Sequence, residues 1–420
     1  MARRISGTGD IAGIVEGLKH AGIGYSGFLT LTVTEARAVV LRETSVAMGM
    51  EEIAASEAVG RFVAGRILAD RDYPPFARSA RDGYAVRAQD VPGELTIVGE
   101  VRAGQAFFSD TLQQGQAVEI MTGAAVPDGA DAVVMIEHTS RIGDKVRIER
   151  SMQPGENFNA KGTEAAAGTD VQGLGRRIGY SDVAVLASVG QGRISVYKRP
   201  VIAIIPTGDE IVEASQQPLP HQIRNSNAAS LAAQVTRAGG IARVLPIARD
   251  NAVSTRQQIA RGLEADLLLL SGGVSAGKYD IVETILAEFG AEFYFDRVKI
   301  QPGQPLVFGR AQGKLFFGLP GNPVSTMVTF EVFARAAIEK MQGNMDERLA
   351  LSWAPLTQAF TQKPGLMRFL PANMSEQGVS PARSQGSGDV FTLARANAFA
   401  VTDPNRESWK AGDLIQVMLK

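Results

Sequence analysis

A glycine-rich polar segment follows a run of four leucines in the middle of the chain. In ADLLLLSGGVSAGKYD, residues 265–280, Ser271, Gly272 and Gly273 come directly after the leucines, and Asp280 ends the segment. Glycines let the backbone approach a ligand closely and point consecutive N–H groups at an anion. The residue types therefore indicate a loop that binds an anionic group.

A second segment places acids after another apolar run. In VIAIIPTGDE, Thr207, Asp209 and Glu210 follow the apolar residues at once. Carboxylates beside phosphates indicate a bridging Mg²⁺. These acids therefore predict a metal-assisted site for a phosphate-bearing ligand.

A third segment, GLPGNPVST, brings Gly321 and Asn322 to the start of a predicted helix, with Pro323 in its first turn. The N-terminus of a helix attracts anions. Each segment also has a plain structural interpretation: a tight turn, a helix cap or an ordinary helix start. Their joint placement is what favours a binding site.

The elements around these segments predict how they meet. Between residues 196 and 345, strands that are apolar throughout alternate with helical patterns. Such strands are typical of a parallel sheet covered by helices on both faces. Ligands bind such doubly wound sheets beyond the carboxyl ends of the strands, so the three segments are expected to share one pocket.

The rest of the chain has a different texture. Helical spacing over residues 31–67 predicts two short helices, the first with Thr34 as its N-cap. Residues 77–150 contain short β-rich runs separated by Gly, Pro and Asp, which is typical of a small β domain. After residue 350 short strands return, including VFTLARANAFAVTD at 390–403, and predict a second β domain.

Composition excludes several classes of protein. The chain has 420 residues, 43 basic against 44 acidic side chains, no cysteine and three separated histidines. It therefore lacks the basic excess of a nucleic-acid binder and any thiolate or histidine-rich metal site. No apolar run suits a signal peptide or a membrane span, so we expect a cytoplasmic protein without nucleic-acid or membrane partners. GTGDIAG and GLGRRIG lack the preceding strand of a dinucleotide site.

Six motifs occur in a fixed order: PPFARSARDGYAVR, GADAVVM, IIPTGDE, SGGVSAGKYD, QPGQP and GLPGNPVST. Together they resemble the molybdopterin molybdenumtransferase family, which includes the MoeA proteins and the E domain of gephyrin. The resemblance implies a homodimer of elongated subunits that inserts molybdate into adenylylated molybdopterin with Mg²⁺ and releases AMP. It also implies possible contacts with other molybdenum cofactor pathway proteins or recipient enzymes.

The resemblance divides each subunit into four parts. They are an elongated linking domain (31–76 and 151–195), an inserted β domain (77–150), a MogA-like α/β molybdopterin-binding domain (196–345) and a C-terminal β-barrel domain (346–420).

The resemblance also assigns site residues. The catalytic residues it implies are Asp82, Asp209, Asp280 and Glu164, and the first three of these also bind the metal. The cofactor-binding residues it implies are Thr207, Gly208, Glu210, Ser271, Gly272, Gly273, Ser275, Lys278, Gln301, Gln304, Pro320, Gly321, Asn322, Pro323 and Ser325.

Several positions depart from the family pattern. Gln301 and Gln304 stand where two anion-binding lysines are expected, and Thr163 and Asn225 each replace an acid. Lys278 occupies a position that commonly carries an acid. Replacing Lys by Gln removes a full charge, and a charge-assisted hydrogen bond is about twice as strong as a neutral one.

The departures leave two functions open. Lys278, Lys299 and Arg297 could rebuild the anion site and keep the enzyme active. Alternatively, the chain is a non-catalytic paralogue that holds pterin or docks partners as a dimeric scaffold. A third class, the adenylylating enzyme of the same pathway, is disfavoured because it needs only the central α/β part. The preference for molybdate or tungstate, and the recipient enzyme, do not follow from the sequence.

Overall fold

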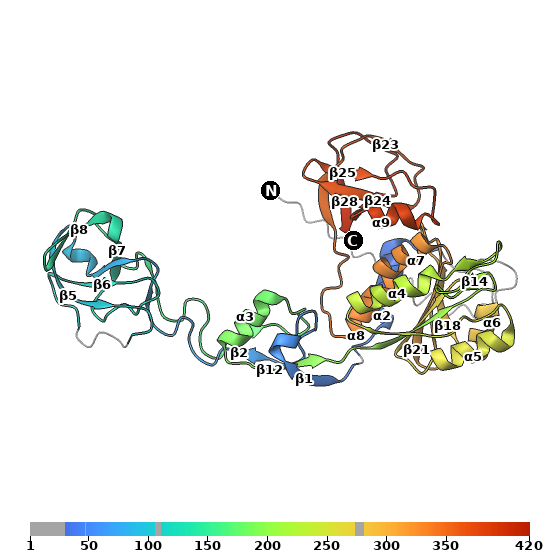
Figure 1. The fold of residues 1–420 in the computed structure, drawn as a ribbon, viewed down its shortest axis with the longest axis horizontal. Helices are drawn as coiled ribbons and strands as arrows, with labels where there is room; N and C mark the ends of the chain where they lie inside the picture. Colours follow the sequence, from blue (N-terminus) through green and yellow to red (C-terminus); the bar gives the residue numbers. More distant parts are fainter. Residues whose placement is uncertain (1–29, 47, 106–110, 274–280) are drawn as a thin grey trace, which may run out of the picture. The chain divides into compact units, whose positions relative to one another are not determined.

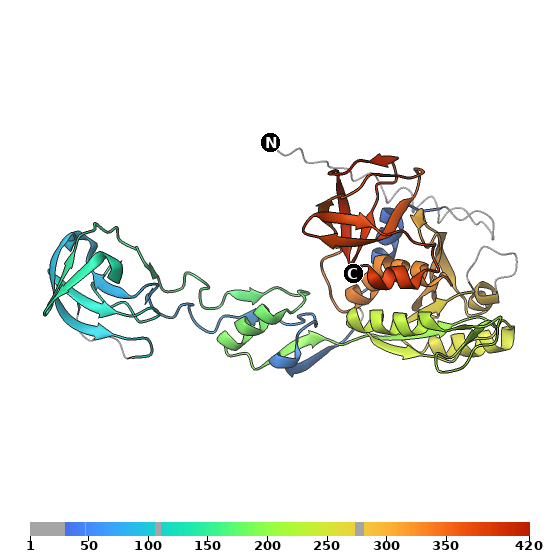
Figure 2. The ribbon, with the colours of Figure 1, turned by 45° about the horizontal axis from the view of Figure 1, so that its top comes forward.

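The computed structural model describes residues 30–46, 48–105, 111–273 and 281–420. It contains two compact units, Gly49–Tyr197 and Met1–Met48 with Lys198–Lys420, each of which is described by itself. Figures 1 and 2 show the ribbon of both. Three residues of the predicted site, Ser275, Lys278 and Asp280, lie outside the described residues.

The larger unit is built on a six-stranded sheet. In spatial order its strands are β16 (Ile241–Val244), β13 (Val201–Pro206), β17 (Leu267–Ser271), β21 (Lys314–Leu319), β20 (Pro305–Ala311) and β18 (Glu292–Arg297). The first four are parallel, as predicted, whereas β20 and β18 pair antiparallel. The two-residue turn at Gln312 and Gly313, both with positive φ, joins β20 to β21, and such a short hairpin permits only antiparallel pairing.

Helices cover both faces of this sheet (Figures 1 and 2). One face carries α2 (Val33–Glu43), α4 (Ser226–Arg237), α7 (Pro323–Thr329), the π-helix η4 (Phe330–Ala334) and α8 (Arg335–Met341). The other carries α5 (Ala252–Gly262) and α6 (Ile281–Glu288). Leu267 and Leu269 enter the first core and Leu268 and Leu270 the second, because successive side chains of a strand point to opposite faces. The doubly wound prediction is confirmed.

The C-terminal part of the same unit is a second sheet. Its strands are β19 (Ile300–Gln301), β24 (Met367–Ser375), β26 (Ala398–Val401), β28 (Leu414–Leu419) and β22 (Ser352–Pro355), with β25 (Gly378–Pro381) beside β24, and a separate pair β23 (Phe360–Thr361) and β27 (Ser408–Trp409). The strand predicted at 390–403 is wrong in its first half, which forms helix α9 (Val390–Arg395). Asp389 caps this helix by accepting the Thr392 N–H at 3.0 Å.

The smaller unit contains the predicted β-rich part. Its six-stranded sheet has the order β7 (Ala132–Met135), β4 (Gly83–Val86), β6 (Gln116–Ile120), β5 (Gly93–Val101), β9 (Lys145–Ile148) and β8 (Thr139–Ile142). The remaining elements are β1 (Met50–Ala54) with β12 (Arg193–Tyr197), β2 (Ile67–Leu68) with β11 (Asp170–Gln172), β3 (Arg78–Ser79) with β10 (Phe158–Asn159), α3 (Tyr180–Ser188), and the 3-10 turns Ala55–Glu57, Ala88–Asp90 and Ile136–His138.

The prediction of two helices over residues 31–67 is wrong for the second, since residues 50–54 form β1. The first helix is α2, but its cap is Thr32 rather than Thr34. The Thr32 Oγ1 accepts the Glu35 N–H at 3.2 Å, while the Glu35 carboxylate accepts the Thr32 N–H at 2.8 Å. This is a capping box, which satisfies two free N–H groups at once.

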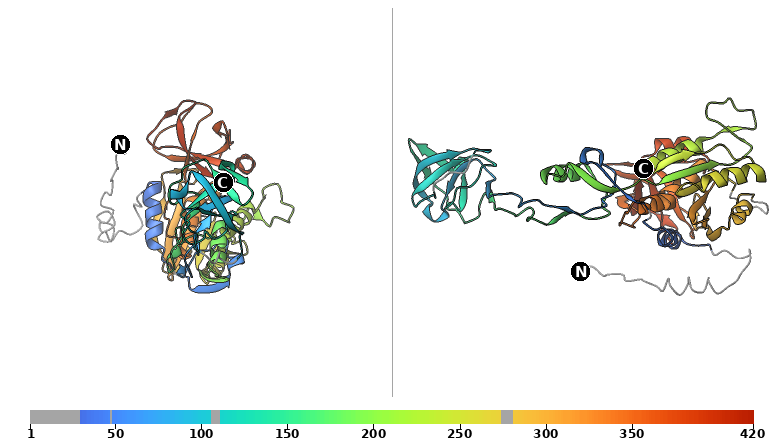
Figure 3. Two further views of the ribbon diagram at one scale, coloured as in Figure 1. Left: turned by 90° about the vertical axis from the view of Figure 1, so that its left-hand side faces the viewer. Right: turned by 90° about the horizontal axis from the view of Figure 1, so that it is seen from below.

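Two short parallel strands, β14 (Ile211–Val212) and β15 (Ile223–Arg224), form a separate two-stranded sheet in the larger unit. The loop that joins them, residues 213–222, stands out from the rest of its unit in both views of Figure 3. No helix in the described part of the chain is long and apolar enough to cross a membrane.

Candidate functional site

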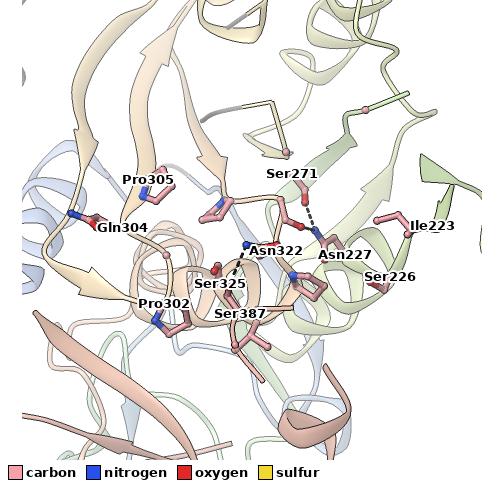
Figure 4. Close-up of a pocket in the computed structure, with 18 of the residues that line it drawn as sticks. Ile223, Ser226, Asn227, Ser271, Pro302, Gln304, Pro305, Asn322, Ser325 and Ser387 are labelled. Carbon is pink, nitrogen blue, oxygen red and sulfur yellow. Dashed lines mark hydrogen bonds between the residues drawn. The ribbon is translucent and has the colours of Figure 1, made fainter. Parts of the chain in front are cut away.

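A pocket of about 1190 Å³ lies at the carboxyl ends of β13, β17 and β21 (Figure 4). Uncharged residues of the C-terminal part also contribute to its wall: Leu366, Phe369, Leu370, Pro371, Ala382, Ser384, Gly386 and Ser387. The predicted cofactor-binding residues that line it are Thr207, Gly208, Glu210, Ser271, Gly272, Gly273, Gln301, Gln304, Pro320, Gly321, Asn322, Pro323 and Ser325. The structure therefore brings the three predicted loops together in one cavity of the larger unit.

The two glycines after β17 are required by close packing. Gly272 and Gly273 have φ of 95° and 65°. A Cβ atom on either would lie 2.9 Å from Thr207 atoms. The Gly272 N–H donates to the Leu319 carbonyl at 3.1 Å, so it is not a donor for a ligand in this arrangement.

Asn227, in the first turn of α4, joins two of the loops. Its Nδ2 donates to the Ser271 Oγ at 2.9 Å and to the Gly321 carbonyl at 2.7 Å. Asn227 was not among the site residues predicted from the sequence. The amide fixes the spacing between the ends of β17 and β21.

Ser387 attaches the C-terminal part to the pocket. Its Oγ accepts from the Asn322 Nδ2 at 2.9 Å, and its carbonyl accepts the Val324 N–H at 3.0 Å (Figure 4). Ser384, Gly386 and Ser387 line the cavity, and sequence reasoning missed all three. The only signal was the polar run ARSQGSGD, which by itself resembles any loop.

The acids of the TGDE segment take different positions. Glu210 lines the pocket, but Asp209 does not. The Asp209 carboxylate accepts the Asp250 N–H at 3.2 Å, and the Asp250 carboxylate accepts the Asp209 N–H at 3.4 Å. Asp250, which the sequence did not single out, does line the pocket. The two carboxylates facing the cavity among the described residues are therefore Glu210 and Asp250.

The cations are distributed differently from what the resemblance implies. Among the described residues that line the pocket, only Arg224 is positively charged. Gln301 accepts a hydrogen bond from the Arg368 Nη1 of the neighbouring strand β24. Neither Arg297 nor Lys299, the cations proposed to compensate, lines the cavity.

Asp82 and Glu164 belong to the smaller unit. The Thr122 N–H and hydroxyl donate to one oxygen of Asp82 at 2.6 and 2.8 Å, and these bonds lower the pKa of Asp82 below its ordinary value. Glu164 accepts from the Arg78 Nη2 at 2.6 Å on the surface. Thr122 is thus a further candidate residue, because it donates both hydrogen bonds to Asp82.

The donors in the pocket suit Mg²⁺ that is shared with a ligand. Within the described ranges, no group of three or more His, Cys, Asp or Glu side chains is placed to hold a metal ion. Mg²⁺ commonly uses one or two carboxylates together with phosphate oxygens and water. Glu210 and Asp250 provide that number of carboxylates, so the residues fit the metal as part of a phosphate complex.

Comparison with known protein families covers most of the chain. Residues 31–190 match the MoeA N-terminal region (domain I and II). Residues 203–340 match a probable molybdopterin binding domain, and residues 353–420 match the MoeA C-terminal region (domain IV).

Individual proteins agree with these matches. The chain is 33% identical over 385 residues to the molybdopterin molybdenumtransferase of Bacillus subtilis, covering 88% of this chain and 89% of that one. It is 38% identical over 309 residues to that of Nostoc sp., covering 71% and 69%. Two crystal structures of the molybdopterin biosynthesis MoeA protein from Pyrococcus horikoshii are similar. One has a TM-score of 0.77 at 26% identity and covers 93% and 100% of the two chains; the other has 0.70 at 30% and covers 93% and 99%.

Proposed function

The chain belongs to the molybdopterin molybdenumtransferase family, and from that premise we propose that it inserts molybdate into adenylylated molybdopterin and releases AMP. The observation that carries the proposal is the pocket, because loops from three parallel strands converge there with two carboxylates and one arginine. Phosphate-bearing ligands bind at this edge of doubly wound sheets.

The reaction cleaves a phosphoanhydride, which places little covalent work on the protein and much on positioning and charge. Mg²⁺, when bound, neutralises charge that develops on the phosphate oxygens. Glu210 and Asp250 would hold the metal. Asn227 holds the Ser271 and Gly321 loops at a fixed spacing, and Asn322 and Ser387 join the C-terminal part to the cavity.

Several further properties belong to the proposal. We place the protein in the cytoplasm and expect it to work as a homodimer. We propose that its four parts have the boundaries given by the resemblance, and that it meets pathway proteins or recipient enzymes. In this dimer Asp82, whose pKa is lowered by its hydrogen bonds from Thr122, would serve the site across the subunit interface. Asp280 and Glu164 keep their proposed catalytic roles, and Ser275 and Lys278 their proposed ligand contacts. Asp209 does not line the pocket, so its proposed role would be to position Asp250 through the two hydrogen bonds between them.

The adenylylating enzyme is not retained. The family matches on both sides of the α/β part, at residues 31–190 and 353–420, are to MoeA regions. The non-catalytic scaffold is not favoured either, because the relatives that match most of the chain are named as transferases.

The proposal is tested by turnover. Purified protein with Mg²⁺, molybdate and adenylylated molybdopterin is expected to release AMP, and omission of either Mg²⁺ or molybdate is expected to suppress the release. Glu210→Gln should reduce the rate by about 10²- to 10³-fold, the usual loss for one electrostatic contact to a transition state. Binding of the pterin substrate without AMP release under any of these conditions would leave the scaffold function instead.

A further inference from the structure

The charged residues of the pocket are unevenly distributed. The segment with Gln301, Gln304 and their neighbouring prolines contributes only uncharged side chains. Glu210, Asp250 and Arg224 come from other segments. In Figure 4, Gln304 lies on the side of the pocket opposite Ile223, which directly precedes Arg224 in the sequence, and Ser226, which comes two residues after it. We call the side around Gln301 and Gln304 the neutral end and the side around Arg224 the charged end; Arg368 donates to Gln301 but does not line the cavity.

Arg224 is held in place without being neutralised. Its Nε donates to the Gln216 carbonyl at 3.1 Å and its Nη2 donates to the Gln217 Oε1 at 3.2 Å. Both acceptors are uncharged and belong to the loop between β14 and β15. In the described part of the chain, no carboxylate forms an ion pair with Arg224, and its Nη1 has no hydrogen-bond partner. A guanidinium that is oriented but unpaired is suited to bind an oxyanion.

The helix that follows adds to this preference. Asn225 caps α4, and its side chain accepts the Ala228 N–H at 3.0 Å. The first turn of this 12-residue helix begins at Ser226, which also lines the pocket. The positive end of the helix dipole therefore lies beside the arginine.

We propose that Arg224 anchors a phosphate group of the substrate, so that the anion binds at the charged end and not at the Gln301–Gln304 segment. This inference rests on the proposed function for the identity of the ligand. Glutamine amides offer one acceptor and two donor hydrogens, so the neutral end suits an uncharged hydrogen-bonding part of the same molecule. Glu210 and Asp250 would hold Mg²⁺, whose charge would offset their repulsion of the phosphate.

AMP, the proposed product, is the probe, and calorimetric titration with Mg²⁺ present throughout is the measurement. Arg224→Gln is expected to weaken AMP binding by about 10- to 100-fold, the range for loss of a hydrogen bond to a charged group. Arg224→Lys should lose less AMP affinity than Arg224→Gln, because lysine keeps the positive charge although it lacks the planar set of N–H donors of the guanidinium. Binding to wild type should weaken as salt rises.

Two further variants test whether the loss of AMP affinity is specific to Arg224. Gln304→Glu puts a negative charge at the neutral end and should weaken AMP binding far less than Arg224→Gln. Arg243→Gln is the matched control, since Arg243 lies on β16, outside the pocket, and donates to the Arg261 carbonyl at 2.8 Å. It should leave AMP affinity unchanged.

Three results would overturn the inference: no AMP binding by wild type, equal affinity of wild type and Arg224→Gln, or a larger loss for Gln304→Glu than for Arg224→Gln. If Arg224→Gln does not fold, the ranking of Arg224→Lys against Gln304→Glu decides. Arg224-dependent AMP binding without AMP release from adenylylated molybdopterin would reject the proposed function and retain the inference.

Discussion

At the scale of single residues, Gln301 stands where the resemblance implies a lysine, and its partner in the structure is a cation. Gln301 and Arg368 are partners on the parallel strands β19 and β24, and the amide oxygen accepts from the guanidinium. A lysine at 301 would place a second cation against Arg368. The neutral Gln301 therefore fits beside the positive Arg368 on the neighbouring strand.

We therefore expect Gln301→Lys to lower the free energy of unfolding by about 1 kcal/mol, because it removes a hydrogen bond and adds like-charge repulsion. Adding Arg368→Gln should recover part of the loss. Gln304→Lys is the control, because no cation in the described residues bonds to the Gln304 side chain, and it should change stability by less than about 0.5 kcal/mol. Urea denaturation measures all four proteins. An unchanged midpoint for Gln301→Lys would show that the bond to Arg368 has no energetic weight.

A second prediction at this scale concerns Asp82. Its pKa is lowered by the backbone N–H and the hydroxyl of Thr122. Thr122→Val removes the hydroxyl and keeps the N–H, so the pKa should rise but stay below its ordinary value. Thr122→Ser, which keeps the hydroxyl, should leave it low. NMR titration of the Asp82 carboxyl measures the three proteins.

The sign of the accompanying pH effect follows from linkage. Since the folded pKa of Asp82 lies below the unfolded value of about 3.9, its ionised form stabilises the smaller unit above that pH. The contribution disappears as pH falls through the folded pKa. At neutral pH, Thr122→Val should therefore have a lower free energy of unfolding than wild type. Under acid conditions, below the folded pKa, the difference between the two proteins should become smaller. If the difference in free energy of unfolding between wild type and Thr122→Val were the same at neutral and acid pH, the hydroxyl would act through packing and not through the charge of Asp82.

The sequence predicted the pocket residues better when they lay within a motif than when they came from elsewhere. Ser271, Glu210 and Asn322 were found because each follows a buried strand. Asp250, Arg224 and Ser387 were missed because only the folded sheet brings them to those loops. A polar residue in a loop has no local pattern that distinguishes a pocket wall from the outer surface.

At the scale of elements, α4 does more than cover the sheet. Its first turn carries Asn227, which ties the Ser271 loop to the Gly321 loop. Asn227→Ala should lower the free energy of unfolding by about 1 to 3 kcal/mol, the cost of leaving hydrogen-bonding groups without partners. AMP release should fall as well, because the two loops lose their fixed spacing.

Ser230→Ala on the same helix is the control, since among the described residues the Ser230 hydroxyl bonds only to the Asn227 carbonyl within α4. Urea denaturation and AMP release are measured on both variants. If Ser230→Ala lost as much stability and activity as Asn227→Ala, the effect would belong to the helix and not to the link between loops.

The elements that sequence reasoning mispredicted share a physical cause. β1 has no fully buried residue, its sequence MEEIA does not alternate between apolar and polar residues, and its partner β12 begins about 140 residues later. α9 is a six-residue helix with one buried residue, too short to show a helical period. By contrast, β13 and β17 are buried along almost their whole length and α4 is buried along one side. The sequence predicted each of these elements. Buried positions must be apolar, so a well-buried element has a recognisable hydrophobic periodicity in the sequence. An element with few buried residues has little periodicity and is hard to predict.

At the scale of the whole molecule, the proposed site residues fall into two units. The pocket belongs to the larger unit, whereas Asp82 and Glu164 belong to the smaller one. Pairing of two subunits would let the smaller unit of one chain serve the pocket of the other. Light scattering should then give twice the 44.6 kDa of one chain at micromolar concentration.

Mixing inactive variants tests whether the site is shared. Asp82→Asn and Glu210→Gln should each be nearly inactive alone. If the two residues meet across the interface, a mixed dimer has one site with both changes and one site with neither. After random exchange about half of the dimers are mixed, and each has one intact site of two, so about a quarter of the wild-type rate of AMP release should return.

If instead both residues serve one site within the same chain, every site in the mixed dimer carries one change, and mixing restores nothing. A dimer mass without recovered activity would therefore place the complete site in a single chain. A monomer mass would remove the shared site altogether. Recovery near a quarter, absent when two samples of the same variant are mixed, would join Asp82 of one chain to the Glu210 pocket of another.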